Sequence, residues 1–301
     1  MLEAKLASKK AQNDRSVIAL SERCTVGGRE LLIIGGPCSV ESREQMEQVA
    51  ATLAQAPVQA LRGGAFKPRT SPYSFQGLGL EGLQILADIS QKHRVPVVTE
   101  VMSVEQVEMV VAHADMLQIG SRNMQNFELL KAVGAVQKPV MLKRGLSATI
   151  EEFIMAAEYI MAHGNPNVVL CERGIRSFDS HTRNVLDLGA VVALKQLTHL
   201  PVLADPSHAA GKRELVADLA RASIAAGADG LMIECHPEPE KSVSDARQAL
   251  SLEDMLALVD SLRPIASAIG RSIPTVADKI TKINTPVDIN SKRIQTVAAI
   301  H

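Results

Sequence analysis

Aromatic residues are scarce in this chain of 301 residues: they make up 2% of it, and tryptophan is absent. A folded core must therefore be built from aliphatic side chains, which suits an eight-stranded barrel filled by Val, Ile and Leu. Proteins that bind single-stranded nucleic acid stack its bases on aromatic side chains. The scarcity of these residues therefore argues against a nucleic-acid partner.

An excess of charge of one sign is lacking as well. The net charge is −1, and no long basic or acidic run occurs, so neither a polyanionic partner nor a membrane surface is expected. No apolar run is long enough to span a bilayer, and residues 1–16 do not resemble a secretory signal. The four cysteines show no CxxC spacing, which favours reduced thiols and a cytoplasmic protein.

Short apolar runs that are typical of buried strands recur regularly along the chain. There are eight of them: 31–35, 58–62, 95–101, 115–120, 138–144, 167–172, 200–205 and 229–234. Their nearly continuous hydrophobicity indicates strands buried on both faces. Helical segments lie between the runs, with Ser42, Ser103 and Thr149 as predicted N-caps. This alternation predicts an α/β fold, the (β/α) eight-stranded TIM barrel.

The chain is expected to divide into three parts. Residues 1–30 form an N-terminal extension with a short hairpin, turning at Gly27–Gly28, that closes the barrel floor; residues 31–265 form the catalytic barrel, and residues 266–301 a tail. A doubly wound open sheet is the rival fold, but no GxGxxG follows the first run. An extension this short does not normally fold alone. We therefore expect no fused regulatory domain and little inhibition by aromatic amino acids.

Polar side chains follow the carboxyl end of every predicted strand, which is where barrel enzymes carry their active sites. A single arginine in a loop is usually a solvated surface charge. Several cations at the same end of the barrel indicate a binding site for anions, because Arg and Lys bind carboxylate and phosphate oxygens. The cations expected to gather there are Arg62, Lys67, Arg69, Arg122, Lys143 and Arg173.

A second group suits a metal ion, because the first, seventh and eighth strands are neighbours when a barrel closes. Its members are Cys38, His208, Glu234 and Asp245. This mixed set of S, N and O donors fits a divalent Mn, Fe, Co or Zn ion, whereas a closed structural zinc site usually has more cysteines. Cys235 and His236 are rival ligands. Strand alternation directs Cys235 away from the side of Glu234, so His236 is the more credible rival.

Several motifs in order resemble one enzyme family. GPCSVES, LRGGAFKPRTSPYSFQG, IGSRN, LKRG, DPSHAAGKR and DGLMIECHPEP occur in the sequence as in the type I 3-deoxy-D-arabino-heptulosonate 7-phosphate (DAHP) synthases. The resemblance covers about residues 30–262 and is strongest to the short subgroup, which is similar to the octulosonate-phosphate synthases. It implies a metal-dependent transferase that condenses phosphoenolpyruvate with erythrose 4-phosphate and water in an aldol-type reaction. The products would be DAHP and phosphate, in the first step of the shikimate pathway to aromatic amino acids.

The resemblance also implies roles for matching residues. Phosphoenolpyruvate would be held by Arg62, Lys67, Arg122, Lys143 and Arg173, and the aldose phosphate by Arg69, Thr70 and Ser71. Cys38, His208, Glu234 and Asp245 match the metal ligands of the family. Lys67, Glu100 and His208 are expected to take part in catalysis, with Asp205 in support. The family further implies a homo-oligomer, either a dimer or a tetramer.

Two alternative functions remain open. The 3-deoxy-D-manno-octulosonate 8-phosphate synthases share the barrel and the phosphoenolpyruvate site but use arabinose 5-phosphate. Their counterpart of residues 67–71 typically reads KANRS, whereas this sequence reads KPRTS, which points to the four-carbon aldose. A non-catalytic metabolite-binding barrel would show a degraded site, and none of the matched positions is lost.

Overall fold

Eight parallel strands form a closed barrel in the computed structural model, which describes residues 3–67, 71, 73–275 and 278. The strands pair in the order β10-β3-β4-β5-β6-β7-β8-β9, and each overlaps one predicted run. They are β3 (Leu32–Gly36), β4 (Ala60–Arg62), β5 (Val97–Val101), β6 (Met116–Ile119), β7 (Val140–Lys143), β8 (Val168–Glu172), β9 (Val202–Ala204) and β10 (Gly230–Glu234). The predicted TIM barrel is confirmed.

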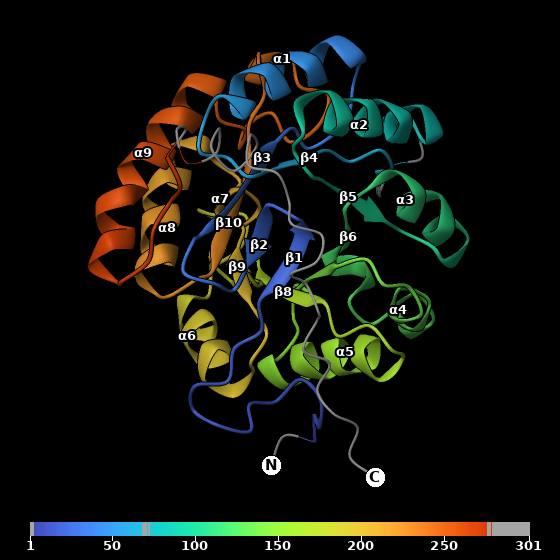
Figure 1. Ribbon diagram of the computed structural model, residues 1–301. Coiled ribbons are helices and arrows are strands. Elements are labelled where there is room, and N and C mark those ends of the chain that lie inside the picture. Colours follow the sequence, from blue (N-terminus) through green and yellow to red (C-terminus); the bar gives the residue numbers. More distant parts are fainter. Residues whose placement is uncertain (1–2, 68–70, 72, 276–277, 279–301) are drawn as a thin grey trace.

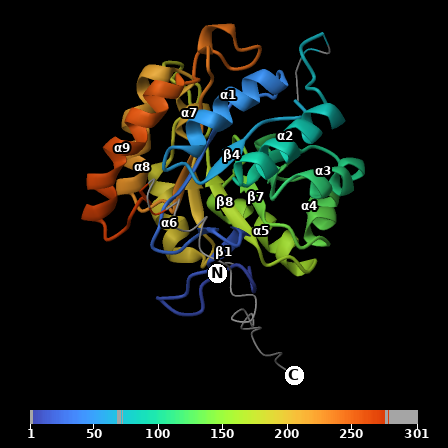
Figure 2. The ribbon, with the colours of Figure 1, turned by 45° about the horizontal axis from the view of Figure 1, so that its top comes forward.

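Helices surround this barrel on its outside (Figures 1 and 2). They are α1 (Arg43–Ala54), α2 (Leu80–His93), α3 (Val107–His113), α4 (Phe127–Gly134), α5 (Ile150–Ala162), α6 (Leu188–Leu197), α8 (Arg213–Ala225) and α9 (Leu252–Ala268). A short helix α7 (Pro206–Ala210) follows β9, and 3₁₀ turns η1 (Val104–Gln106), η2 (Ser121–Asn123) and η3 (Pro239–Lys241) lie in other loops.

Two of the three predicted helix caps form. The Ser42 side chain accepts a hydrogen bond from the Gln45 backbone at the start of α1. Thr149 and Glu152 form a reciprocal capping box at the start of α5. The third prediction was wrong in detail, because Ser103 precedes the 3₁₀ turn η1 and makes no side-chain capping bond.

The barrel interior is aliphatic, as the scarcity of aromatic residues predicts. Alternate strand residues point inward and form one buried cluster: Leu32, Ile34, Ala60, Val98, Met116, Met141, Val169, Cys171, Leu203 and Met232. A hairpin of β1 (Ile18–Ser21) and β2 (Cys24–Val26) adds four more side chains to it. In Figure 1 this hairpin lies at the centre of the ring of helices. The hairpin therefore closes the barrel floor, as expected.

The turn of this hairpin was predicted in the wrong place. Ser21 pairs with Cys24, so the chain reverses at Glu22 and Arg23 rather than at the glycines. Gly27 instead follows β2 with φ at 96°. A Cβ atom there would lie 2.1 Å from the Ser16 carbonyl oxygen. Glycine is needed at this position for close backbone approach and a left-handed conformation, not for the hairpin turn.

The barrel also extends further along the chain than predicted. Helix α9 continues past residue 265 to Ala268, although Pro264 lies within it. Beyond the helix, Ser272 donates its backbone N–H to Arg29 and accepts one from Leu31. These bonds fasten the start of the predicted tail beside the floor of the barrel. Residues 276–277 and 279–301 of that tail lie outside the described residues.

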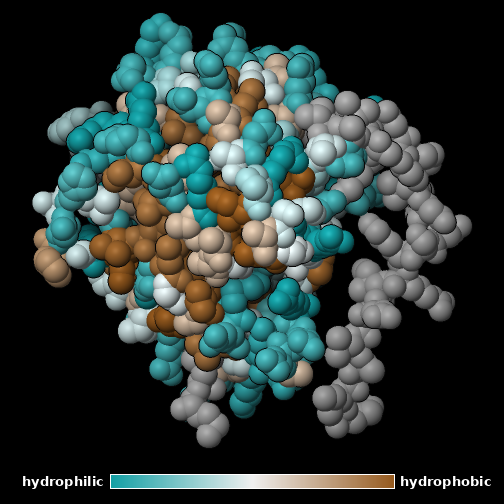
Figure 3. Space-filling view, turned by 90° about the vertical axis from the view of Figure 1, so that its left-hand side faces the viewer, coloured by the Kyte–Doolittle hydropathy of each residue, from teal (hydrophilic) through white to brown (hydrophobic). Residues whose placement is uncertain are grey.

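Figure 3 shows the side of the molecule on which α6, α8 and α9 lie, where apolar side chains gather at mid-height among polar ones. Helix α6 carries two exposed apolar residues, Val192 and Leu197. Patches of this kind can be contact surfaces, but the homo-oligomer stays a prediction. Among the helices of the described ranges, none is both long and apolar enough to cross a membrane.

Removing part of the floor hairpin should destabilise the barrel. Ile18 is 2% exposed and its neighbour Val17 is 59% exposed. We expect Ile18→Ala to lower the free energy of unfolding by roughly 2–5 kcal/mol, because a buried side chain leaves a cavity. Val17→Ala should change it by less than about 0.5 kcal/mol. Urea unfolding followed by circular dichroism measures both, and equal losses would contradict a buried hairpin.

Candidate active site

A cavity of about 320 Å³ opens at the carboxyl ends of the barrel strands. Five of the six predicted cations line it: Arg62, Lys67, Arg122, Lys143 and Arg173. The sixth, Arg69, lies outside the described residues, as does Thr70. Ser71 is exposed, and the lining of the cavity does not include it. Glu100 does line the cavity, and its carboxylate accepts a hydrogen bond of 3.2 Å from the Gln118 amide.

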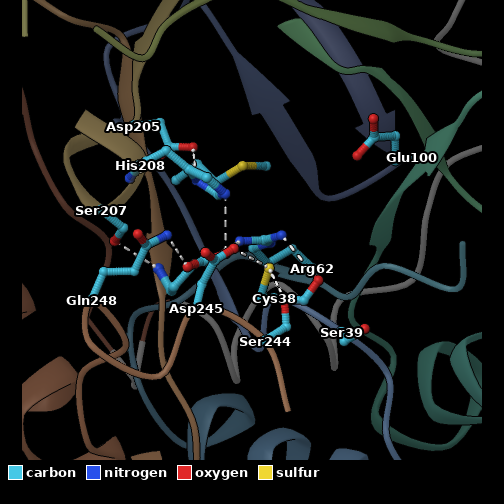
Figure 4. A network of polar contacts seen from close by, with 12 residues as sticks. Cys38, Ser39, Arg62, Glu100, Asp205, Ser207, His208, Ser244, Asp245 and Gln248 are labelled. Carbon is cyan, nitrogen blue, oxygen red and sulfur yellow. Dashed lines mark hydrogen bonds and ion pairs between the residues drawn. The ribbon is translucent and has the colours of Figure 1, made fainter. Parts of the chain in front are cut away.

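The four predicted metal ligands lie together at one side of this cavity. One donor atom from each of Cys38, His208, Glu234 and Asp245 lies within 4.8 Å of the others. Ligands on opposite sides of one ion are about 4–5 Å apart, since each bond measures about 2.0–2.3 Å. Cys38, His208 and Asp245 point toward one another in Figure 4, whereas Glu100 stands apart. The four side chains therefore fit a divalent transition metal.

The rival ligands lie elsewhere. Cys235 packs in the hydrophobic core rather than beside Glu234, as strand alternation predicts. The His236 ring nitrogen Nε2 lies 3.4 Å from Glu41. The Glu41 carboxylate also accepts a bond of 3.0 Å from the Val243 backbone. Glu41 thus ties the loop that carries Cys38 to the loop that carries Asp245.

A carboxylate orients His208 toward the other ligands. Asp205 contacts Nδ1 of His208 at 2.7 Å and also accepts the His208 backbone N–H at the start of α7. The opposite nitrogen, Nε2, then faces Glu234 at 3.3 Å. Metal-binding histidines are commonly held in this way through their second nitrogen. Asp205 also forms an ion pair with Lys143, so it positions two predicted site residues.

Cations of the cavity contact the proposed ligands directly. The Arg62 guanidinium donates to Glu234 at 2.5 Å, and both groups are buried. The Lys67 ammonium lies 2.8 Å from the Cys38 sulfur and 3.0 Å from the Cys38 carbonyl oxygen. Arg173 donates to the carbonyl oxygen of His208 at 3.3 Å. Four predicted anion-binding residues therefore join the predicted metal ligands in one polar network: Arg62, Lys67, Arg173 and, through Asp205, Lys143.

Burial shapes the ionisation of the ligands. Burial, and next the charge of Glu234, raises the pKa of the Cys38 thiol to about 12, so its proton must leave when a cation binds. Burial lowers the pKa of His208, against the opposing charges of Asp205 and Glu234. Burial alone would raise the pKa of Glu234 and of Asp245, but nearby positive charge outweighs it and lowers both. The two carboxylates therefore keep their charge in the buried site.

Sequence reasoning missed five polar residues of the cavity: Gln118, Ser121, Arg176, Arg183 and Asn184. Gln118 lies on β6 with its side chain inward, so strand alternation could have found it. Ser121 begins the turn η2 after β6, beside the predicted Arg122. Arg176, Arg183 and Asn184 lie in the loop between β8 and α6. Nothing in the sequence distinguishes cavity residues from surface residues in a loop of that length.

Arg144 connects both ends of this loop to the barrel. Its guanidinium donates to Glu172 at 2.8 Å and to Asp187 at 3.0 Å. Glu172 also accepts the backbone N–H of Gly174 at the start of the loop. Asp187 caps α6 where the loop ends. Burial raises the pKa of Glu172 despite the partner charge of Arg144. Loss of Arg144 would therefore leave a buried carboxylate without its counter-ion.

Comparison with known proteins agrees with these features. A family model described as the DAHP synthetase I family matches residues 12–267. The phospho-2-dehydro-3-deoxyheptonate aldolase of Thermotoga maritima is 49% identical over 266 residues, which cover 88% of this chain and 78% of the relative. The 2-dehydro-3-deoxyphosphooctonate aldolase of Bordetella petrii is 35% identical over 254 residues, 76% of this chain and 88% of the relative.

Solved structures that are similar to this chain have related names. The crystal structure of the Thermotoga maritima aldolase, also titled DAHP synthase, matches with a TM-score of 0.88 at 47% identity, covering 91% of this chain and 80% of that one. A truncated form of the 3-deoxy-D-arabino-heptulosonate 7-phosphate synthase from the same organism matches with a TM-score of 0.84 at 44% identity. That match covers 90% of this chain and 99% of the truncated one.

Breaking the Arg144 network should destabilise the protein. We expect Arg144→Met to lower the free energy of unfolding by about 3 kcal/mol or more, because Glu172 stays buried without a counter-ion. Since a protonated carboxyl group needs no counter-ion, the loss should shrink as the pH is lowered. Arg43→Met is the control, because its partner Asp88 is 57% exposed and its own side chain 53% exposed; it should cost under about 1 kcal/mol. Urea unfolding at two pH values measures both, and similar losses for the two variants would contradict this role of Arg144.

Proposed function

The chain belongs to the DAHP synthetase I family, and from this premise we propose a metal-dependent 3-deoxy-7-phosphoheptulonate synthase. The enzyme condenses phosphoenolpyruvate with erythrose 4-phosphate and water to give 3-deoxy-D-arabino-heptulosonate 7-phosphate and phosphate. One observation carries the proposal: four side chains with metal-binding chemistry gather beside a cavity lined by cations, and two of them, His208 and Asp245, line it. The identity to the heptonate aldolase, 49%, also exceeds the 35% identity to the octonate aldolase.

The cations of the cavity bind phosphoenolpyruvate in this proposal. Arg62, Lys67, Arg122, Lys143 and Arg173 hold its carboxylate and phosphate, because guanidinium and ammonium groups match those oxygens. Arg69, Thr70 and Ser71 hold the phosphate of the aldose. Two anionic substrates are thereby fixed close together, and such positioning accounts for a large part of catalysis in reactions between two molecules.

Cys38, His208, Glu234 and Asp245 would hold a divalent Mn, Fe, Co or Zn ion. When bound, the ion supplies Lewis-acid activation of the aldehyde oxygen, or orients a water molecule near it. Asp205 keeps Nε2 of His208 directed into the site by its contact with Nδ1. Glu41 and Asp205 thus support the ligands without binding the ion themselves.

The reaction balances with the residues that border the cavity. C3 of phosphoenolpyruvate forms a bond to the aldehyde carbon, and water adds to C2 as the phosphate leaves by C–O cleavage. The water loses both protons as C2 becomes a ketone: one is balanced by the proton that the aldehyde oxygen gains, and the other leaves with the phosphate. In this proposal Lys67, which lies beside Cys38, protonates the aldehyde oxygen. Glu100, which lines the cavity away from the ligands in Figure 4, acts as the general base that accepts a proton of the water.

The first test is phosphate release from phosphoenolpyruvate with erythrose 4-phosphate or arabinose 5-phosphate, each with Mn²⁺ and with a chelator. We expect release with erythrose 4-phosphate and Mn²⁺, and its loss in chelator, because the metal completes the site. Release with arabinose 5-phosphate instead would identify an octulosonate-phosphate synthase. No release with either aldose would indicate a barrel that binds metabolites without catalysis.

A second test removes one ligand. Cys38→Ala should reduce metal-dependent turnover by at least about a hundredfold, since the metal contributes several kcal/mol to stabilising the transition state. Cys235→Ala is the matched control, because Cys235 is also buried but packs in the hydrophobic core. Turnover with Mn²⁺ and circular dichroism are measured for both variants. Full activity of Cys38→Ala in chelator would refute the metal assignment.

A further inference from the structure

Arg183 has no role in the reaction described above, yet it contacts the metal-binding residues. Its Nη1 atom donates to Oδ1 of Asp245 at 3.0 Å and to Oε1 of Gln248 at 3.2 Å. The amide of Gln248 in turn donates to Oε2 of Glu234. Arg183 is therefore bonded to one proposed ligand directly and to a second one through Gln248.

The backbone at Arg183 is fixed to the helix that carries a third ligand. Arg183 and Asn184 donate their backbone N–H groups to Ala210 and Ala209 at 3.0 and 2.8 Å, and the Asn184 side chain donates to the His208 carbonyl oxygen at 3.1 Å. Gly211 has φ at +65°, and a Cβ atom there would lie 2.6 Å from Cβ of Arg183. The backbone and Cβ of Arg183 are thus packed against α7 and against Gly211, which ends it.

Asp245 is held in an unusual backbone conformation. Its φ is 55°, and among the described non-glycine residues only Arg94 also has a positive φ. Arg94 ends α2, where a left-handed residue is common. Such a conformation costs roughly 1–3 kcal/mol and persists when the surroundings enforce it. Arg183 binds one carboxylate oxygen of Asp245, and the other, Oδ2, faces the Cys38 sulfur at 3.0 Å. The bond to Arg183 therefore keeps Oδ2 directed at the metal site.

We propose that Arg183 is a positioning residue for the metal site. It binds Asp245 directly, reaches Glu234 through Gln248, and is held by its backbone to the helix that carries His208. This inference rests on the proposed function, because it takes these side chains as metal ligands. A thiolate and two carboxylates around a divalent ion leave a net negative charge, which Arg183 offsets at Asp245 as Arg62 does at Glu234. Partners of metal ligands of this kind typically contribute 10–100-fold to metal affinity.

Arg183 also lines the substrate cavity, so a role in binding a substrate anion must be separated from a role toward the metal. Titration of the metal-free full chain with Co²⁺, without substrates, makes that separation. Absorption from the cobalt–thiolate bond reports that Cys38 has bound the ion. Steady-state KM values for both substrates at saturating metal report any contact with substrate.

Three variants test the proposal. Arg183→Met should raise the dissociation constant for Co²⁺ about 10–100-fold, with KM values near those of the wild type once metal saturates. Arg183→Gln, which is neutral but keeps a side-chain donor, should show a smaller rise. Arg176→Met is the control: Arg176 lies in the same loop and lines the same cavity. It should leave Co²⁺ affinity unchanged.

The outcomes separate the two proposals. Unchanged Co²⁺ affinity in Arg183→Met and Arg183→Gln, with a normal wild-type signal, would overturn the role of Arg183 alone. An equal loss in Arg176→Met would also overturn it, because any loop cation would then suffice. A wild type without the cobalt–thiolate signal would refute the metal site itself, and the role of Arg183 with it. The Arg183 side chain is 42% exposed, so the variants should fold, which circular dichroism checks.

Discussion

The site depends on the pairing of the last barrel strand with the first. Strand β10 runs parallel to β3, with Glu234 opposite Gly36 and Gly230 opposite Leu32. A Cβ atom at Gly230 would lie 2.0 Å from the Leu32 carbonyl oxygen, so only glycine allows this close approach. The pairing places the ends of these two strands side by side. Glu234 and Cys38, remote in sequence, become neighbours through it.

Two cations of the cavity are paired with acids inside the protein. Arg62 forms a buried ion pair with Glu234, and Lys143 forms one with Asp205. Buried charges of this kind need partners, because an unpaired one is strongly destabilising. The binding groups are therefore oriented before any ligand arrives. Anionic substrates then meet cations that are already in place, rather than gathering them from solvent.

The sequence was informative where residues follow the hydrophobic pattern of strands or match the motifs of a family. The eight apolar runs predicted the barrel, and the order of motifs predicted the set of Cys38, His208, Glu234 and Asp245, which the structure brings together. Contacts between distant loops were not predictable. Arg183 and Asp245 are 62 residues apart, and the loop that carries Arg183 has no periodicity. The hairpin turn was misplaced because a glycine pair was interpreted as a turn, although Gly27 serves a close backbone contact.

The floor hairpin determines from which end of the barrel molecules reach the cavity. Because β1 and β2 fill the end of the barrel opposite the cavity, reactants and products enter and leave at the carboxyl ends of the strands. The hairpin thus restricts exchange with solvent to one end of the barrel.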